Sequence, residues 1–237
     1  MREILGDIRG RAFWVVVGCL VCQMGLGFGY AIGPLAKAML AELGWSRAWL
    51  SSAQAPQAVL IALASPLVGF GVARFGARPV LCWGAIALGT GYALFAAMQA
   101  WWQLAVAWAF VGLGVAGLGD IAVGAVVAQW VTRSRGLALG IVYTGSNIGG
   151  FFATRAMVAI AGAWSWRIAV ASAALAAFAV LLPMAWLAVR DRSLAGAAPG
   201  DPAAEAYDAD DGDLDLGAAW RTRSFWIVAF TDRKSVV

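Results

Sequence analysis

The sequence predicts an all-α membrane protein, a bundle of six transmembrane helices followed by the start of a seventh. Hydrophobic residues make up 62% of the chain and charged residues only 13%, which is too apolar for a soluble domain of 237 residues. Whole windows of about 20 residues lack a charge, and this is the helix length that a hydrocarbon layer of about 30 Å requires. Short polar or aromatic segments separate these windows and supply the turns between helices.

The six predicted helices follow one another within residues 12–189, after an N-terminal segment of residues 1–11. The first helix runs from residue 12 to about 35, and no small-residue cleavage site follows it, so we expect it to be retained. Ser46 is placed to cap the second helix, whose apolar run covers residues 49–72. The other four are expected after Pro79 to near residue 99, then to about 131, at about 136–161 and at about 168–189.

The composition changes after the sixth helix. Residues 190–223 carry an acidic run from Asp201 to Asp215 among Ala, Gly and Pro, which predicts a solvated linker. Residues 224–237 start another apolar run, but Asp232 and the basic residues after it cut this run short. Seven apolar residues cannot span a bilayer, so we expect the truncated start of a seventh helix in a fragment of a longer protein.

The placement of Lys and Arg predicts the orientation of the helices. Arginines concentrate in the segments that share a side with the N-terminus, whereas the opposite turns hold only Arg47 and Arg167, with Lys37 near one helix end. Positive residues favour the cytoplasmic side. We therefore expect a multi-pass protein of the inner (plasma) membrane, with a cytoplasmic N-terminus and linker.

A basic turn is predicted at Gly69–Pro79, between the second and third helices. Gly76 allows the positive φ that a sharp reversal needs, and Pro79 suits the first turn of the following helix. The turn resembles the corresponding loop of major facilitator superfamily transporters, with matches at Gly69, Arg74, Gly76 and Arg78. Ala73 stands where that family usually has an aspartate that joins a gating charge cluster.

Three other segments resemble the same family. Gly44–Ala48, preceded by Tyr30 and Lys37, is similar to the outer first loop of bacterial monocarboxylate and oxalate–formate carriers. The segment from Trp130 to Gly140 resembles the loop into the fifth helix, and Trp164–Arg167 resembles the opening of the sixth.

The resemblance implies the N-terminal half of a secondary active transporter that works by alternating access. Its implied substrate is a small organic anion such as a monocarboxylate, moved with a proton or by exchange. The implied partners are the lipid bilayer and a missing C-terminal six-helix half, and no nucleic acid is expected. The resemblance assigns a gating role to Gly69, Arg74, Gly76 and Arg78.

Two charged residues fall deep within the predicted helices, Asp120 on the fourth and Arg155 on the fifth. Facing either toward lipid is costly, so each is expected to meet a cavity, a partner or bound substrate. The rise of 1.5 Å per residue places them at different depths, which favours separate roles over a direct structural ion pair. Arg155 is a candidate for binding a carboxylate through its paired donors, and Asp120 for carrying a coupling proton.

Polar residues repeat on two helices at helical spacing. Gln23, Tyr30 and Lys37 are seven residues apart on the first helix, and Tyr143 and Asn147 share a face of the fifth. Both stripes are expected either to line a substrate cavity or to bond between helices, and Lys37 alternatively to extend to the headgroups. Gly145 and Gly149 predict close packing on the other side of the fifth helix.

The remaining reactive residues predict neither an enzyme nor a metal site. The chain has no histidine, and its three cysteines lie within apolar runs, where we expect them to be buried hydrophobic residues. No nucleotide-binding loop is present and no cofactor is expected. The alternative to a transporter is a non-transporting membrane sensor or receptor built on the same bundle.

Overall fold

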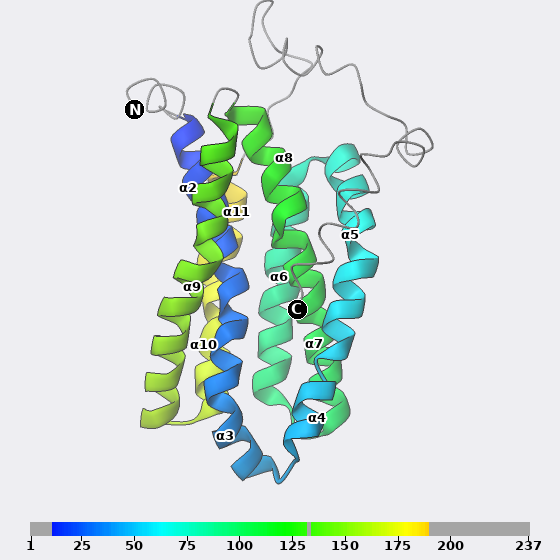
Figure 1. Cartoon of the computed structure of the whole chain (residues 1–237), viewed down its shortest axis with the longest axis vertical. Coiled ribbons are helices and arrows are strands. Elements are labelled where there is room, and N and C mark those ends of the chain that lie inside the picture. Colours follow the sequence, from blue (N-terminus) through cyan, green and yellow to red (C-terminus); the bar gives the residue numbers. More distant parts are fainter. Residues whose placement is uncertain (1–10, 132–133, 190–237) are drawn as a thin grey trace, which may run out of the picture. The chain divides into compact units, whose positions relative to one another are not determined.

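The computed structural model describes residues 11–131 and 134–189, all of which belong to one compact unit of the chain. This part is helical, without strands, and its connections are short (Figure 1). Six of its helices are long and apolar enough to cross a membrane, which confirms the predicted all-α bundle. The predicted linker (190–223), seventh-helix start (224–237) and most of the N-terminal segment lie outside the described residues.

The first three spans contain six helical segments. They are α2 (Arg11–Leu26), the 3₁₀ turn η1 (Gly27–Ala31) and α3 (Ile32–Leu43) in the first span, α4 (Arg47–Ser52) and α5 (Ala55–Phe75) in the second, and α6 (Ala77–Ala97) in the third. The first span continues past its expected end near residue 35, because the apolar pattern resumes after Lys37.

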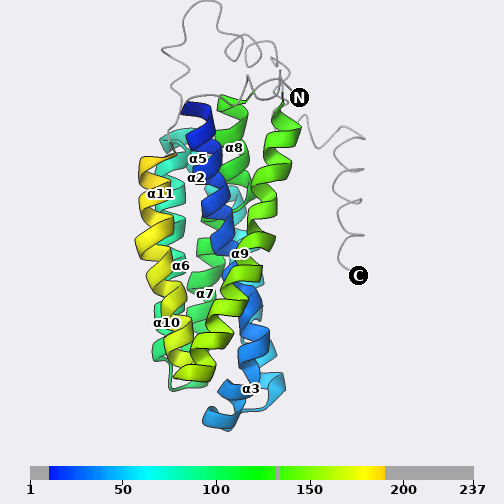
Figure 2. The same cartoon turned by 90° about the vertical axis from the view of Figure 1, so that its left-hand side faces the viewer.

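The last three spans also contain six segments, and successive connections alternate between the two ends of the bundle (Figure 2). They are α7 (Trp101–Leu118) and α8 (Asp120–Trp130) in the fourth span, α9 (Arg135–Ala163) in the fifth, and α10 (Trp166–Ala176), the π-helical turn η2 (Ala177–Leu181) and α11 (Leu182–Leu187) in the sixth.

The turn between the second and third spans is shorter than expected. The helix α5 continues through Phe75 and α6 starts at Ala77, so that only Gly76 lies outside a helix, with φ of 86°. Gly69 and Arg74 are therefore helical, which corrects the predicted loop. The positive φ of Gly76 and the position of Pro79 in the first turn of α6 are confirmed, as is the cap of α4, where Trp49 N donates to Ser46 Oγ.

Glycines set the closest helix contacts. A Cβ at Gly114 of α7 would lie 2.6 Å from the Leu88 backbone of α6, so only glycine permits this approach. On α9, a Cβ at Gly145 would lie 2.6 Å from the Leu20 carbonyl oxygen of α2, and one at Gly149 would overlap the Met24 backbone. The predicted small-residue packing of the fifth helix is thus confirmed, with the first span as its partner.

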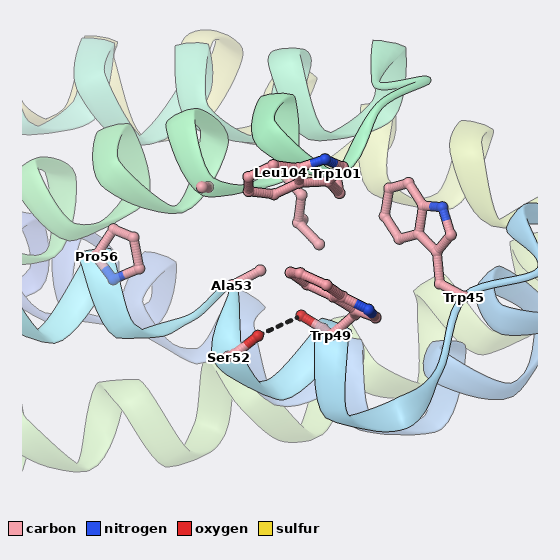
Figure 3. A pocket seen from close by; sticks show the side chains of 8 residues that line it. Trp45, Trp49, Ser52, Ala53, Pro56, Trp101 and Leu104 are labelled. Carbon is pink, nitrogen blue, oxygen red and sulfur yellow. Dashed lines mark hydrogen bonds between the residues drawn. The ribbon is translucent and has the colours of Figure 1, made fainter.

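An aromatic pocket of about 190 Å³ lies where α4 meets the start of α7. The rings of Trp49 and Trp101 lie 5.5 Å apart, and Trp45, Pro56 and Leu104 complete most of the wall (Figure 3). Ser52, the hydroxyl in this wall, donates to the Trp49 carbonyl of its own helix. Indole rings are typical of the boundary between membrane and water, so these tryptophans are suited to anchor this end of the bundle there.

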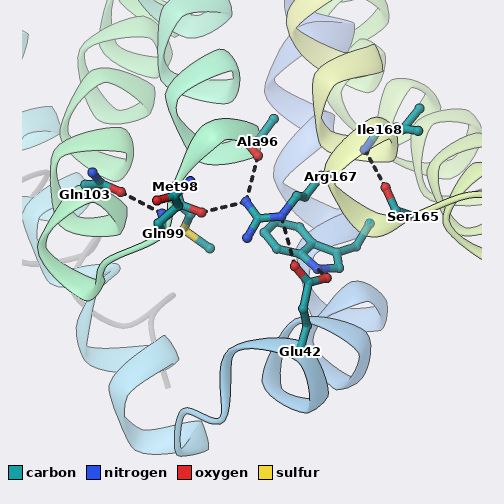
Figure 4. Close-up of polar contacts among 9 residues, drawn as sticks. Glu42, Ala96, Met98, Gln99, Gln103, Ser165, Arg167 and Ile168 are labelled. Carbon is teal, nitrogen blue, oxygen red and sulfur yellow. Dashed lines mark hydrogen bonds and ion pairs between the residues drawn. The ribbon is translucent and has the colours of Figure 1, made fainter.

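A polar clamp joins the first, third and sixth spans (Figure 4). Glu42 accepts hydrogen bonds from Arg167 Nε at 3.0 Å and from Trp166 Nε1 at 2.6 Å. Arg167 Nη1 also donates to the carbonyl oxygens of Ala96 and Met98, at 3.0 and 2.6 Å. The Glu42–Arg167 contact is the one ion pair within residues 11–131 and 134–189. It fixes one end of the bundle.

Candidate functional site

A polar cavity of about 470 Å³, called the central cavity below, lies between the first, second, fourth and fifth spans. Amide, hydroxyl, carboxylate and indole side chains contribute to its wall. The lining residues are Gln23, Leu26, Gly29, Tyr30, Gln54, Gln57, Trp108, Val115, Asp120, Tyr143 and Ser146. Such a concave wall with a few convergent polar groups is typical of a small-molecule site.

Asp120 lies at a break in the fourth span. Gly119 has extended backbone geometry, with φ −75° and ψ −171°, so α7 ends at Leu118 and Asp120 begins α8. The fourth span was expected to be unbroken, because its composition is apolar on both sides of this point. At the first position of α8, the carboxylate lies near free backbone N–H groups and the positive end of the helix dipole, which favour negative charge.

The Asp120 carboxylate has one protein partner within the described part of the chain. Gln23 Nε2 donates to Asp120 Oδ1 at 2.9 Å, and the Gln23 side chain is only 1% exposed. The second carboxylate oxygen, Oδ2, accepts no hydrogen bond from a described residue. Tyr143 also contacts the helix break at Gly119. Its hydroxyl donates a hydrogen bond to the Asp120 backbone oxygen at 3.3 Å. The carboxylate is thus held at one oxygen and available at the other.

Close helix approaches place the polar side chains around the cavity. A Cβ at Gly112 would lie 2.7 Å from the Gln57 carbonyl oxygen, so glycine on α7 lets α5 come near enough to present Gln57 to the cavity. The glycines of α9 likewise let α2 approach closely enough for Tyr143 and Gln23 to line the same cavity. The cavity therefore depends on small residues at its edges.

The structure brings together four of the seven predicted substrate residues. Gln23, Tyr30, Asp120 and Tyr143 line the central cavity, whereas Lys37, Asn147 and Arg155 do not. All three of the latter have exposed side chains, as do Tyr30 and Asp120 in the cavity wall. The substrate role of these seven residues stays a prediction.

Arg155 does not line the central cavity. Its guanidinium lies 5.0 Å from the centre of the Phe151 ring on the exposed side of α9. Within the described residues it forms no ion pair with Asp120, in agreement with the expected separation of the two charges. On α9, the cavity contacts Tyr143 and Ser146 instead.

Among the lining residues with polar atoms in their side chains, those not predicted as site residues are Gln54, Gln57, Trp108 and Ser146. The spacing of Gln54 and Gln57 by three residues was a usable signal, because such residues share a helix face. Trp108 was not predicted to line a cavity, since an indole within an apolar span is equally expected in a core. It is 1% exposed, packs on Phe95, and its Nε1 has no hydrogen-bond partner among the described residues.

Comparison with known proteins identifies the family. Residues 12–231 match the family model of the Major Facilitator Superfamily. The chain belongs to the Major Facilitator Superfamily. Members of this superfamily are membrane transporters, so the protein is a membrane transporter in general class. No curated protein matched the sequence at the significance required.

The four residues that match the gating loop of the superfamily lie at or near the turn at Gly76. Arg74 lies 5.6 Å from the centre of the Phe75 ring, and Arg78 lies 4.1 Å from that of Trp186 on α11. Neither arginine lines the central cavity. The gating role of Gly69, Arg74, Gly76 and Arg78 stays a prediction.

The charge balance of the central cavity is simple. Asp120 is its one charged lining residue within the described part of the chain, and no lysine or arginine accompanies it. No group of three or more potential metal ligands occurs among the described residues, and Cys19, Cys22 and Cys82 are buried and free. The site can therefore bind through hydrogen bonds, aromatic surface and one carboxyl group.

Proposed function

We propose that the protein is the N-terminal half of a proton-coupled secondary active transporter for a small organic anion. The observation that carries the proposal is the polar central cavity, with Asp120 at a helix break inside it. Broken helices at membrane depth are common at transporter binding sites, where they free backbone groups and orient side chains. The resemblance of Gly44–Ala48 to bacterial monocarboxylate carriers supports the substrate class.

Asp120 is the proposed proton carrier, and electrostatics supply the coupling. An ionised Asp120 repels an anion in a cavity that has no base of its own. Protonation removes this repulsion and turns the carboxyl group into a hydrogen-bond donor for the anion. Proton and anion therefore enter and leave the cavity together.

Alternating access requires a second six-helix bundle facing this one, and we propose that a C-terminal half supplies it. The exposure of two spans supports this arrangement. In the most apolar stretch of the second span only 11% of residues are buried, and in the fifth 28%, against 56% in the first, third and fourth. The second and fifth spans thus have faces that this bundle leaves uncovered. We further propose a cytoplasmic N-terminus in the inner membrane, from the distribution of arginines.

The second candidate function is exchange of an organic amine for protons. The observation that favours it is the same lone carboxylate, because Asp120 can bind an ammonium directly and release it on protonation. A sensor that binds without transport is the third possibility.

Uptake by the full-length transporter in proteoliposomes tests the proposal. An inward proton gradient is expected to drive accumulation of a small radiolabelled monocarboxylate above its equilibrium level. Accumulation of an amine under an outward proton gradient, with no monocarboxylate uptake, would favour exchange. Binding without accumulation would contradict transport and favour the sensor.

A further inference from the structure

A second, smaller cavity lies beside the central cavity at one end of the bundle. This mouth cavity has a volume of about 190 Å³ and is formed by α3, α4 and the residues after α4. Its lining residues are Ile32, Gly33, Ala36, Arg47, Leu50, Ser51 and Gln54. No function assigned above uses Arg47 or Ser51.

The two cavities adjoin each other through Gln54, which lines both. Each lies between the first and second spans. Along both spans, the residues that line one cavity are followed by those that line the other. On the first span, the central cavity is lined by Leu26, Gly29 and Tyr30, and the mouth cavity by Ile32, Gly33 and Ala36. The mouth is therefore the neighbouring compartment on the path between the central cavity and the end of the bundle.

Arg47 gives the mouth a charge opposite to that of the central cavity. It is the one basic residue lining either cavity within the described part of the chain. Its side chain is exposed and forms no ion pair or hydrogen bond with a described residue, whereas Arg167 at the same end is used in the clamp with Glu42. Ser51 lies four residues after Arg47, on the same face of α4.

We propose that Arg47, Ser51 and Gln54 form a recruitment site for the carboxylate group of the substrate anion. The guanidinium offers paired N–H donors to two carboxylate oxygens, and the hydroxyl and amide offer neutral donors along the path inward. The site rests on the proposed anion transport. Arg47 first attracts the anion to the mouth cavity. The anion then enters the central cavity, where binding beside Asp120 depends on protonation of that carboxylate.

Transport kinetics of Arg47→Gln in the full-length transporter test this site, with acetate as the probe. Loss of one charge-assisted contact is expected to raise KM about fivefold to tenfold while the maximal rate stays within about twofold. Because the site attracts a charge, KM of the unmodified protein is expected to rise between about 10 mM and about 300 mM salt, and less so in the variant. Arg47→Lys is expected to recover part of the affinity.

Arg135→Gln is the matched control, because Arg135 is an exposed arginine at the start of α9 and lines neither cavity. An unchanged KM in Arg47→Gln, or an equal rise in both variants, would overturn the recruitment site while leaving anion transport in place. If the unmodified protein takes up no acetate or other monocarboxylate, the proposed function itself fails. A lower KM for an amine in Arg47→Gln would then identify Arg47 as a barrier to cations.

Discussion

The hydrogen bond between Gln23 and Asp120 joins the first and fourth spans where the fourth helix is broken. It uses one carboxylate oxygen and leaves the other free, so a single residue both ties two spans together and offers an acceptor to the cavity. Gln23 is almost fully buried and has an amide that can donate here without a charge of its own. Because the Gln23 amide is uncharged, the donor to Asp120 adds no positive charge to the cavity.

Replacement of Gln23 by leucine is expected to destabilise the bundle, because it removes the donor to a carboxylate and keeps a similar side-chain volume. Loss of a hydrogen bond to a charged group costs about 1–3 kcal/mol. Thermal unfolding in detergent measures the change. The control is Asn147→Leu, since the Asn147 side chain is exposed on α9. Equal melting temperatures for the Gln23 variant and the unmodified protein would mean that the bond contributes nothing.

At the scale of the helix, α9 carries two different surfaces. Its glycines pack against α2, whereas Phe151 and Arg155 are exposed on another side of the helix. The sequence predicted the glycine surface correctly from the spacing of Gly145 and Gly149. It did not predict which polar residues would contact the cavity, because helical spacing gives the relative direction of side chains and not the neighbour that covers them.

Gly149→Ala is expected to separate α9 from α2, because the added Cβ overlaps the Met24 backbone, which cannot rotate away. Overpacking of this kind costs about 1–3 kcal/mol. Gly140→Ala is the matched change on the same helix: no atom of another part of the protein lies within 4 Å of its Cβ position. There alanine is expected to be neutral or to stabilise by up to about 1 kcal/mol. The difference in melting temperature between the two variants measures the close contact, and its absence would contradict it.

At the scale of the whole bundle, the polar clamp and the central cavity involve different sets of spans. Glu42 and Arg167 fix the ends of the first, third and sixth spans, whereas the cavity uses the first, second, fourth and fifth. The first span takes part in both. We infer that the third and sixth spans serve as a rigid support against which the cavity-lining spans hold their positions.

The composition and the positions of turns were enough to predict the six spans, the cap at Ser46 and the reversal at Gly76, because these depend on local physics. The break at Gly119 was missed, since a glycine in an apolar run is equally compatible with a continuous helix. The clamp was also missed: Trp164–Arg167 was identified by its resemblance to the opening of the sixth helix, but its partner Glu42 is more than a hundred residues away in the chain. Long-range pairing of this kind leaves no periodic signal.

The role of Asp120 is tested most directly by Asp120→Asn in the full-length transporter reconstituted in proteoliposomes. Asparagine has the same shape and keeps an acceptor for Gln23, but it cannot bind and release a proton. We expect proton-driven accumulation of the monocarboxylate to be lost, while exchange of labelled for unlabelled substrate across the membrane persists. Accumulation at the unmodified rate under a proton gradient would contradict a proton-carrying Asp120.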